Sequence, residues 1–279
     1  MTFLDRAIAV NGLTLHYVEW GSPHSPPLVL LHGLTGHART WDHLAAELTG
    51  RFRILALDQR GHGDSDRALD GDYRVDTMVA DLAGFADALR LERFALVGLS
   101  MGGRVAIAYA GRYPARLDRL VIVDIGPEIH PAGLERIRAM MAGAPERIDS
   151  SEQAIEYARR ANPLADQAEL RHRVTHGLRP LTDGGLTWKY DRALREMMRS
   201  GGRRDAVDLW APLGHIACPT LIIRGAVSDV LSIDVATQMI EKLPDARLVE
   251  VAGAGHSVPG DRPEEFARVV SAFLAPGPR

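Results

Sequence analysis

Cysteine is nearly absent from this sequence, because Cys218 is the only one among 279 residues. No intrachain disulfide can form, which excludes the small secreted folds that depend on a disulfide framework. Cys218 opens an apolar run, so we expect a small buried apolar side chain there.

An excess of charge of one sign is also missing. The net charge is −3, with 33 Lys and Arg residues against 36 Asp and Glu residues, so nothing favours binding to nucleic acid or to an anionic membrane. No apolar run approaches the length of a membrane span, and the N-terminal segment has no stretch typical of a signal peptide. We therefore expect a cytoplasmic protein, a monomer or small homo-oligomer, whose partner is a small-molecule substrate.

The sequence has no internal repeat and no low-complexity tract, and its composition is that of one large globular domain. Short apolar runs alternate with segments of helical periodicity, which predicts an α/β fold built on a parallel sheet. The predicted strands are 13–21, 26–33, 51–58, 93–100, 117–124, 218–225 and 246–253, and the predicted helices include 40–48, 75–91, 103–114, 232–243 and 263–274.

This alternation stops between residues 127 and 210, where the sequence is charged, helical in pattern and free of strand-like runs. We predict that this segment is a helical cap inserted into a core domain of residues 1–126 and 211–279. Two glycine clusters, "TDGGL" at 182–186 and "SGGRR" at 200–204, divide the cap into about four short helices.

Ser100 stands where a predicted strand gives way to a predicted helix, in "FALVGLSMGGRVAIAYAGRYP". Gly98 and Gly102 flank it in the pattern G-x-S-x-G. Small residues allow other chain segments to approach a strained strand-to-helix turn, from which the hydroxyl protrudes at the carboxyl edge of the sheet. A purely structural turn explains the glycines but not the serine, so we predict that Ser100 is a nucleophile.

A serine hydroxyl needs a positioned base, which an acid in turn orients. His256 follows a strand and a glycine-rich loop in "VEVAGAGHSV", and we predict that it is the base. Two acids follow strand ends before it: Asp124 ends "LVIVD" and Asp229 follows "LIIRGAVSD". We prefer Asp229, because its short loop comes directly after the strand that precedes the histidine strand. Asp124 remains the alternative acid, or a support for the turn at Ser100.

Backbone amides usually stabilise the oxyanion of such an intermediate. The amide of Met101 comes directly after the nucleophile. The amide of Leu34 lies in "LLHGLTG", where His32 and Gly33 allow the chain to turn at a strand end. We predict that Leu34 and Met101 form the oxyanion hole.

The inserted segment offers candidates for substrate contact and for metal binding. Trp188 and Tyr190 in "LTWKYDR" and His130 in "GPEIHPAG" are candidate substrate-binding residues. His172 and His176 have a spacing that could bind a metal on one helix face, but the sequence offers no acidic or thiol ligand close by. We therefore predict no metal site and a solvated cap face there.

The motifs "LLHGLTG", "LALDQRGHGDSD", "VGLSMGG", "RGAVSD" and "GAGHSV" come in the order and spacing of the α/β-hydrolase superfamily. The resemblance covers nearly the whole chain outside the inserted segment. It implies an α/β-hydrolase fold with an eight-stranded, mostly parallel sheet, helices on both faces, and a helical cap after the sixth strand. It also implies hydrolysis through an acyl-serine intermediate without a cofactor.

Carried over to this chain, the resemblance makes Ser100 the nucleophile, Asp229 the acid and His256 the base, with Leu34 and Met101 as oxyanion donors. The stretch 58–66, "DQRGHGDSD", resembles the family's structural loop after the fourth strand, which is not a metal site.

The same motifs narrow the expected activity. Ser100 argues against epoxide hydrolases and haloalkane dehalogenases of the family, which attack with an aspartate. Ser257 stands where the carbon–carbon bond hydrolases typically carry a tryptophan. We expect a serine carboxylesterase acting on a small-molecule ester. A lactonase, an amide or carbon–carbon bond hydrolase and a cofactor-free perhydrolase are alternatives on the same triad.

Two further points stay open. Some relatives that cleave carbamates and amides place the acid after the sixth strand, which keeps Asp124 in consideration. A ligand receptor built on the same fold is the alternative from another class, but the cap composition does not indicate an interaction surface.

Overall fold

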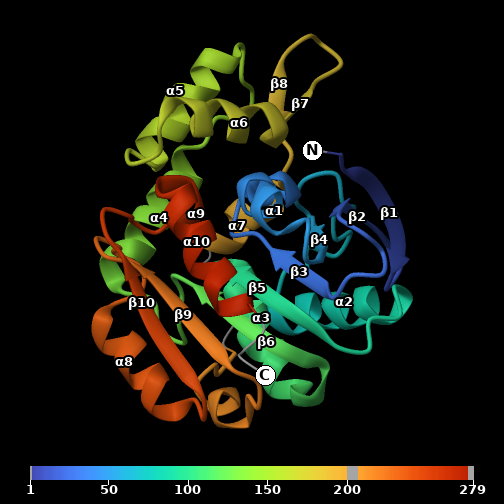
Figure 1. The fold of residues 1–279 in the computed structure, drawn as a ribbon. Helices are drawn as coiled ribbons and strands as arrows, with labels where there is room; N and C mark the ends of the chain where they lie inside the picture. The colour runs from blue at the N-terminus through green and yellow to red at the C-terminus, as the bar shows by residue number, and fades with distance from the viewer. Residues whose placement is uncertain (1, 200–206, 276–279) are drawn as a thin grey trace.

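A computed structural model of the chain describes residues 2–199 and 207–275. Its eight-stranded sheet has the order β1-β2-β4-β3-β5-β6-β9-β10 (Figure 1). Strand β2 pairs antiparallel with β1 and β4, and all the other neighbours are parallel. The strands are β1 (Leu4–Val10), β2 (Leu13–Trp20), β3 (Pro27–Leu31), β4 (Arg53–Leu57), β5 (Phe94–Leu99), β6 (Leu117–Val123), β9 (Thr220–Gly225) and β10 (Ala246–Val251). The predicted fold class is confirmed.

Helices cover both faces of this sheet (Figure 1). None of the helices within residues 2–199 and 207–275 combines the length and the apolar character needed to cross a bilayer. The helices are α1 (Asp42–Leu48), α2 (Val75–Ala88), α3 (Met101–Arg112), α4 (Pro131–Gly143), α5 (Ser151–Ala161), α6 (Gln167–Gly177), α7 (Ala193–Arg199), α8 (Ile233–Lys242), α9 (Val258–Asp261) and α10 (Pro263–Leu274), with 3₁₀ turns at Ala38–Trp41, Pro114–Arg116 and Ala211–His215.

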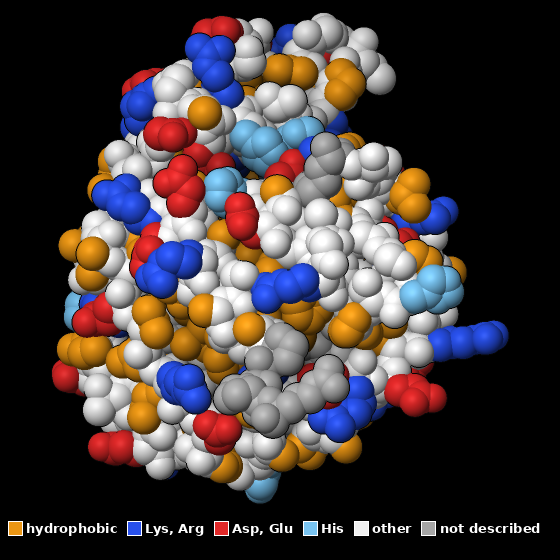
Figure 2. Space-filling view, viewed as in Figure 1, with side chains coloured by type: hydrophobic (Ala, Val, Ile, Leu, Met, Phe, Trp, Pro, Cys, Tyr) orange, Lys and Arg blue, Asp and Glu red, His pale blue; other side chains and the backbone are white. Residues whose placement is uncertain are grey.

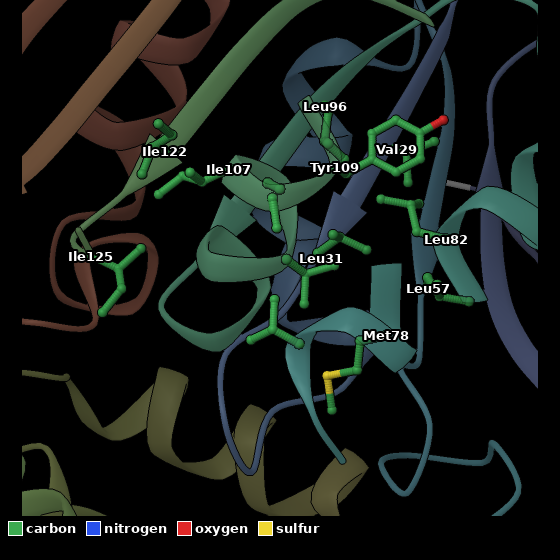
Figure 3. Close-up of a cluster of buried hydrophobic side chains, with 14 of the residues drawn as sticks. Val29, Leu31, Leu57, Met78, Leu82, Leu96, Ile107, Tyr109, Ile122 and Ile125 are labelled. Carbon is green, nitrogen blue, oxygen red and sulfur yellow. The ribbon is translucent and has the colours of Figure 1, made fainter. Parts of the chain in front are cut away.

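The central strands are apolar at every position because both of their faces are buried. In β3, Leu28 and Leu30 belong to the cluster under α1 and α10, whereas Val29 and Leu31 belong to the cluster under α2 and α3. Figure 3 shows this second cluster, in which strand side chains meet Met78 and other residues of the helices. The two-sided core fixes the carboxyl ends of β3, β5 and β6 side by side.

The inserted segment lies above those strand ends and contains helices α4 to α7 (Figure 1). It also contains a short antiparallel pair, β7 (Leu178–Pro180) and β8 (Leu186–Trp188), which the sequence pattern did not indicate. The glycine cluster at 182–186 forms the turn of this pair, with Gly184 at φ +86°. The cluster at 200–204 lies outside the described residues.

Candidate active site

Ser100 lies in a sharp turn between β5 and α3. Its φ of 51° is in the left-handed region, which a residue with a side chain rarely adopts without a strong constraint. The glycines supply the space for this turn. A Cβ on Gly98 would lie 2.4 Å from the carbonyl oxygen of Gly102, and one on Gly102 would lie 2.4 Å from that of Leu31. The turn exists because no side chain separates these backbones.

The hydroxyl of Ser100 points to an imidazole. The Oγ atom lies 2.9 Å from Nε2 of His256, which the loop between β10 and α9 carries to the same sheet edge. The other ring nitrogen, Nδ1, lies 2.8 Å from Oδ2 of Asp124. Because an ionised carboxylate can only accept, Nδ1 carries the proton and Nε2 is left to accept from the serine.

Asp124 comes directly after β6 and is fully buried, with φ +48°. Three donors hold its carboxylate. Besides His256, the amide of Gly225 donates to Oδ1 at 2.8 Å, and the hydroxyl of Ser228 donates to Oδ2. A buried charge needs such partners, since each unmet hydrogen bond would leave a large desolvation cost. Sequence reasoning did not identify Ser228.

The structure brings the alternative acid, Asp124, to His256, and not the preferred acid, Asp229. Asp229 follows β9 as expected, but its carboxylate binds Arg136 of α4 at 2.6 and 2.7 Å. This guanidinium lowers the pKa of Asp229. Strand β6 is the direct neighbour of β5, so Asp124 leaves the sheet beside Ser100, whereas the loop after β9 carries Asp229 outward to the inserted segment.

The two predicted oxyanion donors border the same cavity as Ser100. Met101 is the first residue of α3, where a backbone amide has no acceptor within the helix. Leu34 follows the turn after β3, and a Cβ on the neighbouring Gly33 would lie 3.2 Å from Cβ of Ser100. Both amides therefore lie close to Ser100, and their role in catalysis stays a prediction.

A cavity of about 280 Å³ lies between the sheet edge and the inserted segment, with Ser100 and His256 in its wall. Its lining is mostly apolar and comes from both parts of the chain. The apolar lining includes Val75, Met78, Ile129, Leu134, Ile137, Met140, Leu170, Met197 and Met198, and the charged lining comprises Arg104, Arg136, Glu169 and Arg173.

The three predicted substrate-binding residues lie elsewhere. Trp188 and Tyr190 line a second cavity of about 20 Å³, which shares Arg173 and a few other residues with the main one. The indole of Trp188 donates to the carbonyl of Pro145. His130 is not in the lining of either cavity and caps the start of α4. Contact of these three residues with a substrate stays a prediction.

His172 and His176 are less exposed than predicted, because Asp42 of the core packs against them. Nε2 of His172 lies 2.9 Å from Oδ2 of Asp42, and the ligand atoms of Asp42, His172 and His176 lie within 4.8 Å of one another. Figure 2 shows histidines at the surface where the inserted segment meets the core. Asp42 is already paired with Arg39 at 2.6 Å, so this cluster first of all joins α6 to the core.

The loop at 58–66 closes around a buried carboxylate. Asp58 accepts hydrogen bonds from His16 at 2.7 Å and from the amide of Asp64 at 2.9 Å. A Cβ on Gly63 would lie 2.1 Å from this carboxylate, so only glycine fits there. These contacts agree with the structural role predicted for the loop.

Residues 26–263 match a family model described as alpha/beta hydrolase fold. The chain is 29% identical over 272 residues to the 2-(acetamidomethylene)succinate hydrolase of Mesorhizobium japonicum, covering 98% of this chain and 95% of the relative. It is 31% identical over 266 residues to the 3-hydroxybutyrate-oligomer hydrolase of Cupriavidus necator, covering 90% of each. A crystal structure of E-2-(acetamidomethylene)succinate hydrolase is similar with a TM-score of 0.89, at 28% identity over 98% of this chain and 99% of that one.

Proposed function

The chain belongs to the α/β-hydrolase family, and from this premise we propose that it is a serine hydrolase that cleaves a small-molecule carboxylic ester through an acyl-serine intermediate. The observation that carries the proposal is the continuous contact from Ser100 through His256 to Asp124, at 2.9 and 2.8 Å. A hydroxyl, an imidazole and a buried carboxylate in this order are the parts needed to activate a serine.

In the proposed first step, Oγ of Ser100 attacks the carbonyl carbon while Nε2 of His256 takes its proton. The Asp124 carboxylate stabilises the imidazolium that forms. The amides of Leu34 and Met101 donate to the oxyanion, and each such donor contributes roughly 3 kcal/mol to the stability of the transition state. The imidazolium then protonates the leaving alcohol, which departs and leaves the acyl group on Ser100.

In the second step, a water takes the place of the alcohol. His256 removes a proton from this water, the resulting hydroxide attacks the acyl carbonyl, and Ser100 leaves with its proton restored. The mostly apolar lining of the cavity disfavours other water beside the ester. The product is a free carboxylic acid.

Cleavage of an amide on the same site is the second candidate. Two observations favour it: the acid follows β6, as in some amide-cleaving relatives, and a similar protein hydrolyses a compound with an acetamido group. The names of both reported relatives also indicate substrates with carboxylate groups, a succinate and a hydroxybutyrate oligomer. Matched nitrophenyl esters and nitroanilides of one acid distinguish the two candidates.

The test of the proposal is turnover of nitrophenyl esters by the wild type and by Ser100→Ala. We expect the alanine variant to lose on the order of a million-fold in turnover, because it lacks the hydroxyl that forms the acyl intermediate. A fluorophosphonate probe should modify the wild type at Ser100, as mapped by mass spectrometry of its peptides. Efficient ester cleavage by Ser100→Ala would refute the mechanism.

A further inference from the structure

The charges in the main cavity are not balanced. Of its arginines, Arg136 is paired with Asp229, and Arg104 has an interaction partner within the protein. Arg173, by contrast, has no carboxylate oxygen within 4.0 Å of its guanidinium among residues 2–199 and 207–275. The guanidinium of Arg173 is half-buried and has five N–H donors. An arginine in a cavity that has no carboxylate partner in the protein can bind an anionic group of a ligand.

The position of Arg173 relates it to the reacting atoms. The residue lies on α6, and its Nη2 donates to Oγ1 of Thr35 at 3.0 Å. Thr35 comes directly after Leu34, the predicted oxyanion donor. His37, from the same loop, contacts the backbone carbonyl of Arg173 at 3.2 Å, which fixes this part of α6 over the loop. The guanidinium therefore lies beside the turn that would hold the scissile carbonyl.

Tyr190 provides a second polar group at the smaller cavity, which Arg173 also lines. Its side chain is 6% exposed, and its hydroxyl has no hydrogen-bond partner within the described residues. Tyr190 and Arg173 both line the smaller cavity, whose volume of about 20 Å³ suffices for about one water. Burial raises the pKa of the Tyr190 phenol, so it remains a proton donor. A buried donor without an acceptor beside an arginine also favours an anionic guest.

Glu169 is the acidic residue in the lining of the main cavity. It precedes Arg173 by one helical turn, but no ion pair within 4.0 Å joins the two. Burial raises the pKa of the Glu169 carboxyl. The lining of the main cavity as a whole is mainly apolar and includes Met140. An acyl chain with a carboxylate at its far end matches this arrangement.

We propose that Arg173 binds a carboxylate on the acyl part of the substrate, so that the preferred esters are half-esters of short dicarboxylic acids. This inference rests on the proposed function and specifies its substrate class. The neutral remainder of the acyl chain lies against the apolar wall while the guanidinium and the Thr35 hydroxyl hold the carboxylate. Arg173 acts on binding and selectivity and takes no part in proton transfer.

The experiment compares two esters of nearly equal shape: mono-4-nitrophenyl glutarate and 4-nitrophenyl 5-methylhexanoate, in which an isopropyl group replaces the carboxylate. For the wild type we expect kcat/KM to be at least about 30-fold higher for the glutarate, as a hydrogen-bonded charge allows. Arg173→Gln should remove this preference by lowering only the glutarate value. Arg171→Gln, at an exposed position of the same helix, is the matched control and should retain it.

Equal losses on both esters in Arg173→Gln, or no glutarate preference in the wild type, would overturn the inference. If the wild type cleaves neither ester, the proposed function fails, and calorimetric titration with glutarate then tests the anion site alone. Saturable glutarate binding that Arg173→Gln abolishes supports the site. Absence of binding, or binding unchanged by the substitution, refutes it.

Discussion

Ser100 and Asp124 share an unusual conformation. Both have positive φ, 51° and 48°, although neither is glycine, and they lie on opposite sides of His256. Each such residue costs of order 1–3 kcal/mol, which the surrounding structure must offset. For Asp124 the offset comes from three hydrogen bonds to a fully buried carboxylate. The strain places both functional groups at the sheet edge and pointed at the imidazole.

The sequence pattern identified His256 as the residue that meets Ser100. It did not identify Asp124 as the preferred carboxylate partner of His256. Ser100 and His256 follow strand ends within glycine-rich turns, so their side chains were expected at one edge. Asp124 and Asp229 satisfy the same criterion equally well. The choice depends on Arg136, 93 positions before Asp229, which binds that carboxylate. No local pattern reports such a contact. Ser228 precedes Asp229 in the sequence, and its hydroxyl donates to Asp124 instead.

Ser228 should act as a positioning residue. In Ser228→Ala, the Asp124 carboxylate loses one of its three donors, and a hydrogen bond to a charged group contributes about 1.5–3 kcal/mol. We expect kcat to fall about tenfold or more with little change in KM, because the effect arises as His256 becomes charged. Steady-state kinetics on a nitrophenyl ester measure both values.

Ser232→Ala is the control, since it removes a serine from the same stretch of chain. Ser232 caps α8 through the amide of Val235 and touches no part of the site. Its loss should lower the free energy of unfolding by about 1 kcal/mol and leave kcat unchanged. A kcat of Ser228→Ala within twofold of the wild type would argue against the positioning role.

Among the elements, the sequence pattern predicted the buried strands and the helices between them. The central strands are apolar at every position because both faces are buried, and the helices have apolar residues at helical spacing because one face is buried. Two kinds of strand were missed. Strand β1 is an edge strand whose residues are largely exposed, so it shows no apolar run. Strands β7 and β8 have three residues each and form only through a hairpin closed by Gly184. Short or exposed pairing leaves too little apolar pattern to detect.

The inserted segment is joined to the core by polar contacts as well as by the cavity wall. Asp42 of α1 binds His172, and Thr35 binds Arg173, one turn of α6 holding both partners. The sequence showed the His172 and His176 pair but could not place Asp42 beside it, because the two segments are 130 positions apart. The helices of the inserted segment were therefore predicted, but the contacts that hold them against the core were not.

At the scale of the whole molecule, burial of histidines links stability to pH. Burial lowers the pKa of His32 to about 3 and those of His37 and His62 to about 4. In the unfolded chain the ordinary value near 6.5 applies. Between pH 4 and 6.5 the unfolded state therefore binds more protons than the folded state, and stability decreases as the pH falls through this window.

We expect the free energy of unfolding to drop by about 2 to 4 kcal/mol per pH unit between pH 6 and 5, since two to three extra protons bind on unfolding. Urea denaturation at pH 8, 7, 6 and 5 measures this. His24→Gln, at an exposed position, should reproduce the wild-type curve. Unfolding free energies that stay constant from pH 7 to 5 would contradict neutral, buried histidines in the folded protein.

The most direct test of the proposed Ser100–His256–Asp124 triad compares the turnover of Asp124→Asn with that of Asp229→Asn on one nitrophenyl ester. The structure places Asp124 against His256 and Asp229 against Arg136. We predict a loss of about ten-thousand-fold for Asp124→Asn, because the imidazole loses its tautomer and its counter-charge, and a loss below about tenfold for Asp229→Asn. The opposite order would show that Asp229 serves His256 during catalysis and would contradict the pairing of Asp124 with His256 in the working enzyme.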